Sequence, residues 1–168
     1  MQHGWAVFLC VAVLMTPAFA ATGPAPDADK AAALPFTAEP VFRDFGLLGD
    51  WAVACDKPSS PLNPHVNVTA PGAGLIVEHH DVGTDFAPNL YHVVAARRVD
   101  SKDIEARALF RPGTENEDEQ TLVIRVAKDR QGTDTRRTMF NRGEDGVRVK
   151  NGVAVRSGVK TAVLKRCP

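Results

Sequence analysis

From Trp51 to the C-terminus, apolar and polar side chains alternate along the chain with a period of two. In the stretch 103–111, for example, Ile104 and the residues at every second position after it are apolar, while charged residues fill most positions between them. This spacing is typical of antiparallel strands with one face in the core and one in solvent. No segment carries a helical stripe of useful length, although a short helical turn is expected just before Trp51.

The alternating segments predict an all-β fold. Short connections favour an up-and-down meander, and closing it into a small antiparallel barrel of about eight strands would leave no exposed edge strand. A two-sheet β-sandwich is the alternative that the pattern leaves open. The expected strands lie near residues 51–55, 65–70, 74–81, 89–98, 103–111, 120–128, 135–141 and, as two short strands, 146–165.

The sequence VRVKNGVAV at residues 147–155 reads as a hairpin whose register depends on the length of its loop. A three-residue loop, 150–152, pairs Val149 with Val153 and brings all four valines to one face. Gly152 then falls where such a loop needs a left-handed residue. A two-residue Asn-Gly turn would mix the faces, so the hydrophobic pattern favours the three-residue loop.

The N-terminal part of the chain differs from the alternating part. Residues 1–20 have the apolar run of a secretory signal, too short to span a bilayer, and end in Ala-Phe-Ala at 18–20, a cleavage sequence. Residues 21–40 are rich in Ala and Pro and predict a flexible arm. Residues 41–168 are therefore expected to form a single β-domain, exported to the periplasm or secreted, with no stable membrane span after cleavage.

Export changes how the three cysteines are counted. Cys10 lies within the signal, which leaves Cys55 and Cys167 as a pair in an oxidising compartment. A disulfide between them is the expectation, with two thiols or a metal pair as alternatives. Such a bond would close a loop of 112 residues. In the chain-entropy model, a loop of this length constrains the unfolded state by roughly 4–5 kcal/mol.

The formal net charge is zero, but the charges are unevenly distributed. Residues 121–168 hold 12 Lys and Arg against 4 Asp and Glu, a difference of +8, whereas residues 41–120 hold 7 against 13, a difference of −6. A basic region can indicate an anionic partner. Two halves that interleave in one domain would instead neutralise each other, and this interpretation is favoured. The basic residues lack interleaved aromatic residues, so nucleic acid is not expected as a partner.

Gly49-Asp50-Trp51, at the first expected strand, resembles the G-x-W signature of lipocalin-like (calycin) barrels. In that family a tryptophan packs at the closed end beneath an arginine of the last strand, and Arg166 stands at the matching place. The resemblance implies a barrel in which Trp51 and Arg166 have structural roles. Small secreted barrels that inhibit bacterial metalloproteases share this architecture, and this chain is similar to them in its export signal, N-terminal arm and single disulfide.

Candidate chemistry is sparse. His79 and His80 point to opposite faces of a strand, so one ion cannot bind both, although one of them could meet His92 across a hairpin with Asp81 nearby. Surface histidines are the favoured interpretation, and no serine lies in a recognisable nucleophile context. The acidic stretch 115–119 lacks the ligand spacing of a calcium loop and is expected at a hairpin tip. No catalytic, metal-binding or cofactor-binding residue is predicted.

The sequence therefore predicts an exported, non-enzymatic β-domain. Its leading expected function is the binding of a small apolar or amphipathic molecule. The alternatives are a module that binds an extracytoplasmic protein, such as a protease inhibitor, and a structural envelope protein. The Pro-rich connection 55–65 is either a lid over a barrel mouth or an ordinary ordered loop fastened by the disulfide.

Overall fold

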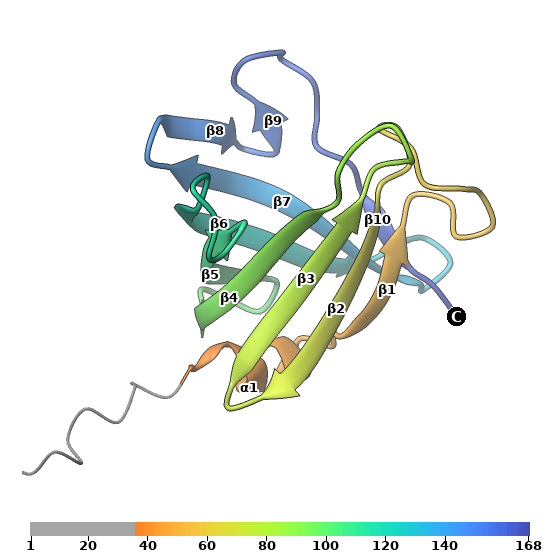
Figure 1. Ribbon diagram of the computed structural model, residues 1–168. Coiled ribbons are helices and arrows are strands. Elements are labelled where there is room, and N and C mark those ends of the chain that lie inside the picture. Colours follow the sequence, from red (N-terminus) through yellow and green to blue (C-terminus); the bar gives the residue numbers. More distant parts are fainter. Residues whose placement is uncertain (1–35) are drawn as a thin grey trace, which may run out of the picture. The chain divides into compact units, whose positions relative to one another are not determined.

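The computed structural model describes residues 36–168, which form ten β-strands and one short helix (Figure 1). Each strand from β1 to β7 pairs antiparallel with the next, so the chain forms an up-and-down meander. The elements are α1 (Ala38–Asp44), β1 (Gly49–Ala52), β2 (His65–Gly72), β3 (Leu75–Asp81), β4 (Asn89–Arg98), β5 (Asp103–Phe110), β6 (Asp118–Lys128), β7 (Asp134–Gly143), β8 (Gly146–Lys150), β9 (Val153–Ala154) and β10 (Leu164–Arg166).

Strand β10 closes the sheet. On one side it pairs with β1, placing Arg166 opposite Trp51, and on the other with β7, placing Leu164 opposite Arg136. Strands β1 to β7 and β10 thus form a closed ring of eight antiparallel strands. The predicted small barrel is confirmed, and the sandwich alternative is wrong because both edges of β10 are paired.

A disulfide joins the chain just after β1 to the chain just after β10. The Cys55 and Cys167 sulfurs are 2.00 Å apart and the two Cα atoms 5.6 Å apart. Beside this bond, the Cys167 backbone N–H donates to the Asp50 carbonyl at 2.8 Å. The predicted pairing is confirmed, and it links the two strands at the seam of the barrel.

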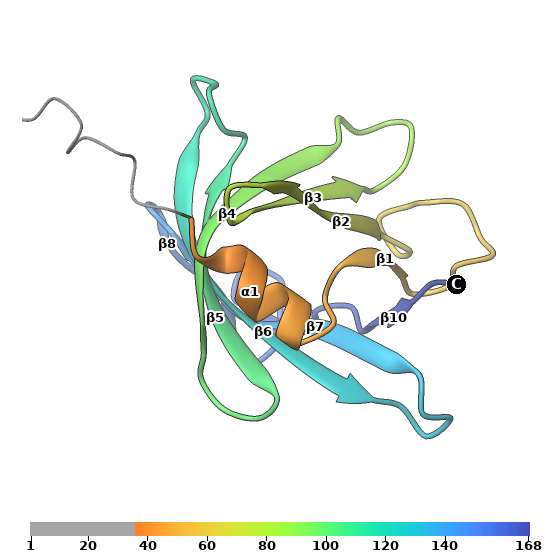
Figure 2. The same cartoon turned by 90° about the horizontal axis from the view of Figure 1, so that it is seen from below.

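Helix α1 lies across one end of the barrel, which we call the closed end (Figure 2). Ala38 and Phe42, four residues apart, lie on one face of the helix and are fully buried. The helix ends in a Schellman motif: Leu47 N–H donates to the Phe42 carbonyl, and Gly46, with φ +62°, takes the left-handed position. The turn sends the chain directly into β1.

The folded part begins earlier than the sequence indicated. The start was predicted near Val41, yet Ala38 is completely buried and the Thr37 N–H donates to the Val94 carbonyl at 3.1 Å. Residues 38–40 of the predicted arm 21–40 therefore belong to α1. The predicted signal peptide, residues 1–20, and residues 21–35 lie outside the described residues.

Trp51 and Arg166 meet at the closed end. The indole N–H of Trp51 donates to the Leu47 carbonyl at 2.9 Å, and the ring is almost completely buried. The Arg166 guanidinium lies 4.7 Å from the Trp51 ring centroid and donates to the Leu48 carbonyl at 2.7 Å. One arginine thereby ties the last strand to the turn after α1.

The predicted hairpin register is wrong. Val149 pairs with Ala154 and Lys150 with Val153, so the loop is the two-residue turn Asn151-Gly152, with both residues at positive φ. The pattern of valines predicted the wrong register because β8 and β9 extend beyond the ring of strands. There Val147 and Val155 are 39% and 58% exposed, so no buried face selects the register.

Candidate functional site

The barrel interior is apolar at one end and polar at the other. Towards α1 it is filled by apolar side chains, including Trp51, Phe42 and Ile76. Beyond Ile76 on the same inward face of β3 come Glu78 and His80, and opposite them β7 contributes Arg136. This polar half lies towards the connections β1–β2 and β3–β4, which we call the open end (Figure 1).

A buried ion pair lies at the centre of the polar half. Arg136 Nη2 donates to Glu78 Oε1 at 2.8 Å, and these side chains are only 5% and 6% exposed. The other carboxylate oxygen, Glu78 Oε2, lies 2.8 Å from His80 Nε2. Because an ionised carboxylate only accepts hydrogen bonds, the proton of this contact belongs to His80 Nε2. Both oxygens of Glu78 are therefore engaged.

The protonation states of Glu78 and the nearby Tyr91 are fixed near neutral pH. Burial acts to raise the pKa of Glu78, but the Arg136 charge and the contact with His80 outweigh it and lower the pKa to about 2. Burial, helped by the Glu78 charge, raises the pKa of the nearby Tyr91 to about 12. Glu78 is thus a carboxylate and Tyr91 a phenol over the whole physiological range.

Aromatic rings continue the polar cluster towards the open end. The His80 and Tyr91 ring centroids are 4.8 Å apart, and those of Tyr91 and Phe110 are 5.0 Å apart. The rings come from β3, β4 and β5 in turn, and Tyr91 stands directly opposite Phe110 in the sheet. The tilted contacts add to the packing of this part of the barrel wall.

Two cavities adjoin the ion pair. The larger, of about 140 Å³, opens between β7 and the segment leading into β10, and the smaller, of about 20 Å³, lies deeper in the barrel. Both are lined by His80, Arg136 and Thr138. The larger cavity adds an apolar wall made of Pro64, Val66, Ala162 and Leu164. We call the larger one the Arg136 cavity.

One donor group of the Arg136 side chain makes no hydrogen bond to any described residue. Its Nη1 atom is buried and has no hydrogen-bond partner among the described residues, although Nη2 is paired with Glu78. A buried guanidinium N–H without an acceptor costs roughly 1–3 kcal/mol. Arg136 lines both cavities, although the Nη1 atom itself has almost no accessible surface.

The rim of the Arg136 cavity is held by β7. Arg137 Nε donates to Thr161 Oγ1 at 3.0 Å, and Arg137 Nη2 donates to the Gly152 carbonyl. Glycine is favoured at position 152, because φ is +71° and an added Cβ would come within 2.8 Å of the Arg137 guanidinium, which would have to move. These contacts fasten the chain that carries Thr161 and Ala162 to the edge of the cavity.

Side-chain hydrogen bonds hold the β1–β2 connection in place beside the cavity. The Asn63 side chain donates to the carbonyls of Ala54 and Pro58 and accepts from the Ala54 N–H. Ser59 Oγ donates to Asp81 Oδ2 at 2.8 Å, which links the β1–β2 connection to the end of β3. The predicted Pro-rich segment 55–65 is therefore an ordered loop fastened at several points.

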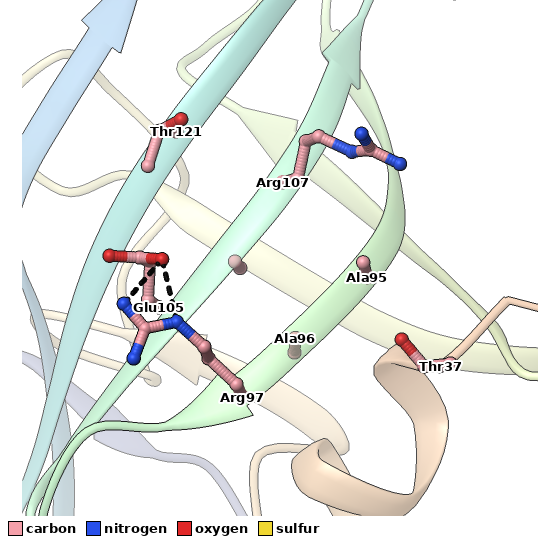
Figure 3. A pocket seen from close by; sticks show the side chains of 8 residues that line it. Thr37, Ala95, Ala96, Arg97, Glu105, Arg107 and Thr121 are labelled. Atoms are coloured by element: carbon pink, nitrogen blue, oxygen red, sulfur yellow. Dashed lines mark hydrogen bonds and ion pairs between the residues drawn. The ribbon is translucent and has the colours of Figure 1, made fainter.

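A broader hollow, of about 470 Å³, lies on the outer face of β4 and β5 (Figure 3). Its charged side chains satisfy one another: Arg97 and Glu105 form an ion pair at 2.8 Å, and Arg107 points away from that pair. Arg97 is 65% exposed, so water screens the contact strongly. This hollow presents no buried polar group that needs a partner, and it is the weaker candidate.

The histidines of the sequence do not converge. His79 pairs with Leu90 and lies on the outer surface, whereas His80 faces the barrel interior. His92 stands opposite Val77, so it directly faces neither of them. Among residues 36–168, no group of three His, Cys, Asp or Glu side chains is placed to hold a metal ion. Of the acidic stretch 115–119, residues 115–117 lie in the β5–β6 connection, where Glu117 accepts from the Gly113 N–H, and the last two residues begin β6.

Sequence reasoning missed Glu78, Tyr91, Arg136 and Thr138. The available signal was a charge in the alternation: Glu78 follows Ile76 at a spacing of two, so it shares the face of a core residue. The other face of β3, with Leu75 and Val77, is more apolar and concealed this signal. Arg136 lies in the run Arg136-Arg137, which puts one arginine on each face of β7 without indicating which is inside.

Comparisons with known proteins place no constraint on the site: no family model, curated protein or solved structure matches this chain. Within residues 36–168, the single helix is far too short to cross a bilayer.

Proposed function

We propose that the chain is an exported, non-enzymatic binding protein that takes up one small amphipathic molecule in the Arg136 cavity. The observation that carries the proposal is the cavity of about 140 Å³ beside the buried Glu78–Arg136 pair, which is lined by polar side chains, including Arg136 and Thr138, and by an apolar wall. The closed barrel and the Trp51–Arg166 contact are compatible with a lipocalin-like architecture. The disulfide fits the proposed periplasmic or secreted location.

Size limits the ligand. The Arg136 cavity measures about 140 Å³. An apolar cavity of about 150 Å³ accommodates benzene, whereas sites for drug-sized ligands measure about 300–1,000 Å³. A long lipid chain is therefore a poor candidate, and a molecule of roughly six non-hydrogen atoms is a good one.

The protonation states favour binding over catalysis. A general acid or base works best when its pKa lies near the working pH. Glu78, with its pKa lowered to about 2, and Tyr91, with its pKa raised to about 12, are both far from neutrality. Both oxygens of Glu78 are also occupied. Glu78 and Tyr91 lie next to the Arg136 cavity without lining it, and they are poorly suited to exchanging protons with a ligand there.

The proposal is tested by blocking the cavity. Ala162 lines it, while its neighbour Val163 is 47% exposed and does not. Methyl NMR signals of Val66 and Leu164 should shift when small alcohols, amides and carboxylates of about six non-hydrogen atoms are added. Ala162→Phe should abolish these shifts, and the matched control Val163→Phe should retain them. No shift with any probe in the wild-type protein would favour a structural envelope role instead.

A second candidate function is binding to another extracytoplasmic protein, for example as a protease inhibitor. It is favoured by two side chains on the pinned loops of the open end, Leu62 and Phe86, which are 90% and 53% exposed. Rigid apolar side chains of this kind are suited to filling a partner's pocket. If a co-secreted protease is inhibited, Leu62→Asp should relieve the inhibition. Val99→Asp, at an exposed position in the β4–β5 connection, should not.

A further inference from the structure

We infer that the β8–β9 hairpin binds the surface of a membrane that contains anionic lipids. We define the hairpin as residues 146–160, which comprise β8, β9 and the turn after β9. It lies outside the closed ring of strands, beside the end of β7 (Figure 1). This membrane contact is separate from the proposed function, because no residue of the hairpin lines the Arg136 cavity.

The charged side chains of the hairpin are all positive. Residues 146–160 contain four Lys and Arg and no Asp or Glu. Arg148 is neutralised by ion pairs with Asp118 and Asp145, at 2.8 and 2.7 Å. The other three cations are exposed and form no ion pair with any described residue: Lys150, Arg156 and Lys160. Neutralisation between the acidic and basic parts of the chain, which the sequence favoured, therefore does not extend to the hairpin.

Exposed valines lie among these charges. Nine large apolar side chains are exposed among residues 36–168, and three of them belong to the hairpin: Val147, Val155 and Val159. The Val155 N–H donates to the carbonyl of Arg148, the neighbour of Val147, at 2.8 Å. The N–H of Ala154, the neighbour of Val155, donates to the Val159 carbonyl at 2.8 Å. The three valines therefore come from neighbouring segments that are hydrogen-bonded to one another.

The barrel holds the backbone of the hairpin in place. The Gly152 N–H donates to the Met139 carbonyl of β7 at 2.8 Å, and the Gly152 carbonyl accepts from the Thr161 N–H at 2.9 Å. Arg137 of β7 donates to the same carbonyl. Because these bonds fix the backbone before any contact is made, binding a surface through the hairpin costs less conformational entropy.

The composition of the hairpin favours a lipid surface over a folded protein. The strongest contacts in protein interfaces come from large side chains, above all Trp, Tyr and Arg, that fill pockets in the partner. The hairpin contains no aromatic residue, and its largest apolar side chains are valines. Binding to a lipid surface depends instead on apolar area at the head-group boundary and on the attraction of Lys and Arg to anionic lipids. The exposed cations and valines of the hairpin supply both.

Sedimentation with lipid vesicles tests the inference. The protein purified after export should sediment with vesicles of phosphatidylcholine and phosphatidylglycerol in equal parts, and at least about tenfold less tightly with vesicles of phosphatidylcholine alone. Raising the salt concentration to about 0.5 M should remove most of the binding, because salt shortens the distance over which charges attract. Both measurements use the wild-type protein.

Charge variants identify the surface that binds. Each Lys or Arg close to an anionic membrane contributes about fivefold in affinity, so changing the three exposed cations of the hairpin to glutamine should weaken binding at least about tenfold. The control changes three exposed cations on other parts of the barrel, lowers the net charge equally, and should weaken binding less than about threefold. The hairpin variant is Lys150→Gln, Arg156→Gln and Lys160→Gln, and the control is Lys57→Gln, Lys102→Gln and Arg130→Gln.

A second pair of variants tests the valines without changing the charge. Val155→Ser combined with Val159→Ser reduces the apolar area of the hairpin and should weaken vesicle binding at least about threefold. The control, Leu62→Ser combined with Val99→Ser, removes exposed apolar side chains from two other connections and should leave binding unchanged. These side chains are exposed, so all four variants should fold.

Each outcome supports or overturns the membrane contact. Equal binding to both kinds of vesicle, or binding to neither, overturns it. Equal losses in the two charge variants overturn the assignment to the hairpin, since net charge alone then explains them. Unchanged binding in the hairpin valine variant overturns the apolar part of the contact. If soluble polyglutamate binds as tightly as the anionic vesicles, the partner is an acidic protein instead. None of these results depends on ligand binding in the Arg136 cavity.

Discussion

The two ends of this barrel differ in the kind of side chain that they bury. At the closed end, α1 and the turn after it pack Phe42, Leu47 and Trp51 into a fully apolar core. At the open end, the interior holds Glu78 and Arg136, a charge pair whose partners are each about 5% exposed. Burying apolar area stabilises a fold, whereas burying an ion pair carries a desolvation cost that often exceeds the attraction gained.

This difference indicates where stability and function lie. An apolar pair of similar volume in place of Glu78 and Arg136 would often hold the barrel together as well or better. The charged pair also lies beside the Arg136 cavity. A region that keeps such groups, while the opposite end of the same strands is filled with apolar side chains, is the part of the molecule to which a ligand should bind.

The largest effect is expected from Trp51→Ala at the closed end. Trp51 is 1% exposed and contacts the core beneath α1, so its loss removes a large buried surface and leaves a cavity. The free energy of unfolding should fall by about 3–5 kcal/mol. Urea denaturation followed by circular dichroism measures the change. A loss below about 1 kcal/mol would mean that the closed end is not the stabilising half.

The next largest loss of stability is expected when the disulfide at the seam of the barrel is removed. Cys55→Ser and Cys167→Ser each remove the bond that closes 112 residues, so each should lower the free energy of unfolding by about 2–5 kcal/mol, and by the same amount. The bond acts mainly on the unfolded chain, so binding in the Arg136 cavity should persist in the folded variants. Unequal losses in the two variants would point to a separate role for one of the thiols.

Acid should weaken the open end selectively. The pKa of Glu78 is lowered from 4.5 to about 2 in the folded protein, so its stabilising contribution is present above pH 4.5 and is lost as the pH falls through about 2. A shift of this size corresponds to roughly 3 kcal/mol. Glu78→Gln should therefore cost about this much near pH 6 and much less near pH 2, where about half of the folded wild-type protein carries a protonated Glu78, which resembles the amide.

Urea denaturation of both proteins between pH 2 and pH 6 provides the measurement. Other carboxyls with lowered pKa values, such as Asp118 and Asp129, titrate in the same range, but they are common to the two proteins and cancel in the difference. A difference that does not change with pH would show that the Glu78 charge adds nothing to the stability of the open end.

The closed end was largely predictable from the sequence, as was the barrel itself. Alternation located β1 to β7 to within a few residues, because each of these strands has one buried face. For residues 146–165 it predicted two short strands, whereas the structure has β8, β9 and the closing strand β10 from residue 146 onward. The pairing of Cys55 with Cys167 followed from counting the cysteines of the exported chain. The start of the domain was misplaced because α1 is a single short helix in which only Ala38 and Phe42 are fully buried, too few for a visible periodic pattern.

The open end was only partly predictable: Glu78 left a charge in the alternation of β3, but register shifts in other strands conceal which residues face the interior. In β4, Val93 pairs with Ala108 and Ala96 with Ala106, so one extra residue lies between two inward-facing positions. Such a bulge reverses which residues face the interior beyond it. The contact between Glu78 and Arg136 joins strands that lie 58 residues apart, and only the closed ring brings them together.

The smallest effect is expected in the β8–β9 hairpin, which lies beyond the ring and holds the rim of the open end. Gly152 and Gly158 both have positive φ, +71° and +69°, so alanine is strained at either position. An added Cβ at Gly152 would meet the Arg137 guanidinium at 2.8 Å, whereas at Gly158 it would meet nothing within 4 Å. Gly158→Ala should therefore cost about 1 kcal/mol and Gly152→Ala about 1 kcal/mol more. Because Arg137 also holds Thr161, only Gly152→Ala should disturb the Val66 and Leu164 methyl signals of the cavity. If the two variants behave alike in both stability and cavity signals, Arg137 does not connect the hairpin to the site, and the open end is organised by the ring of strands alone.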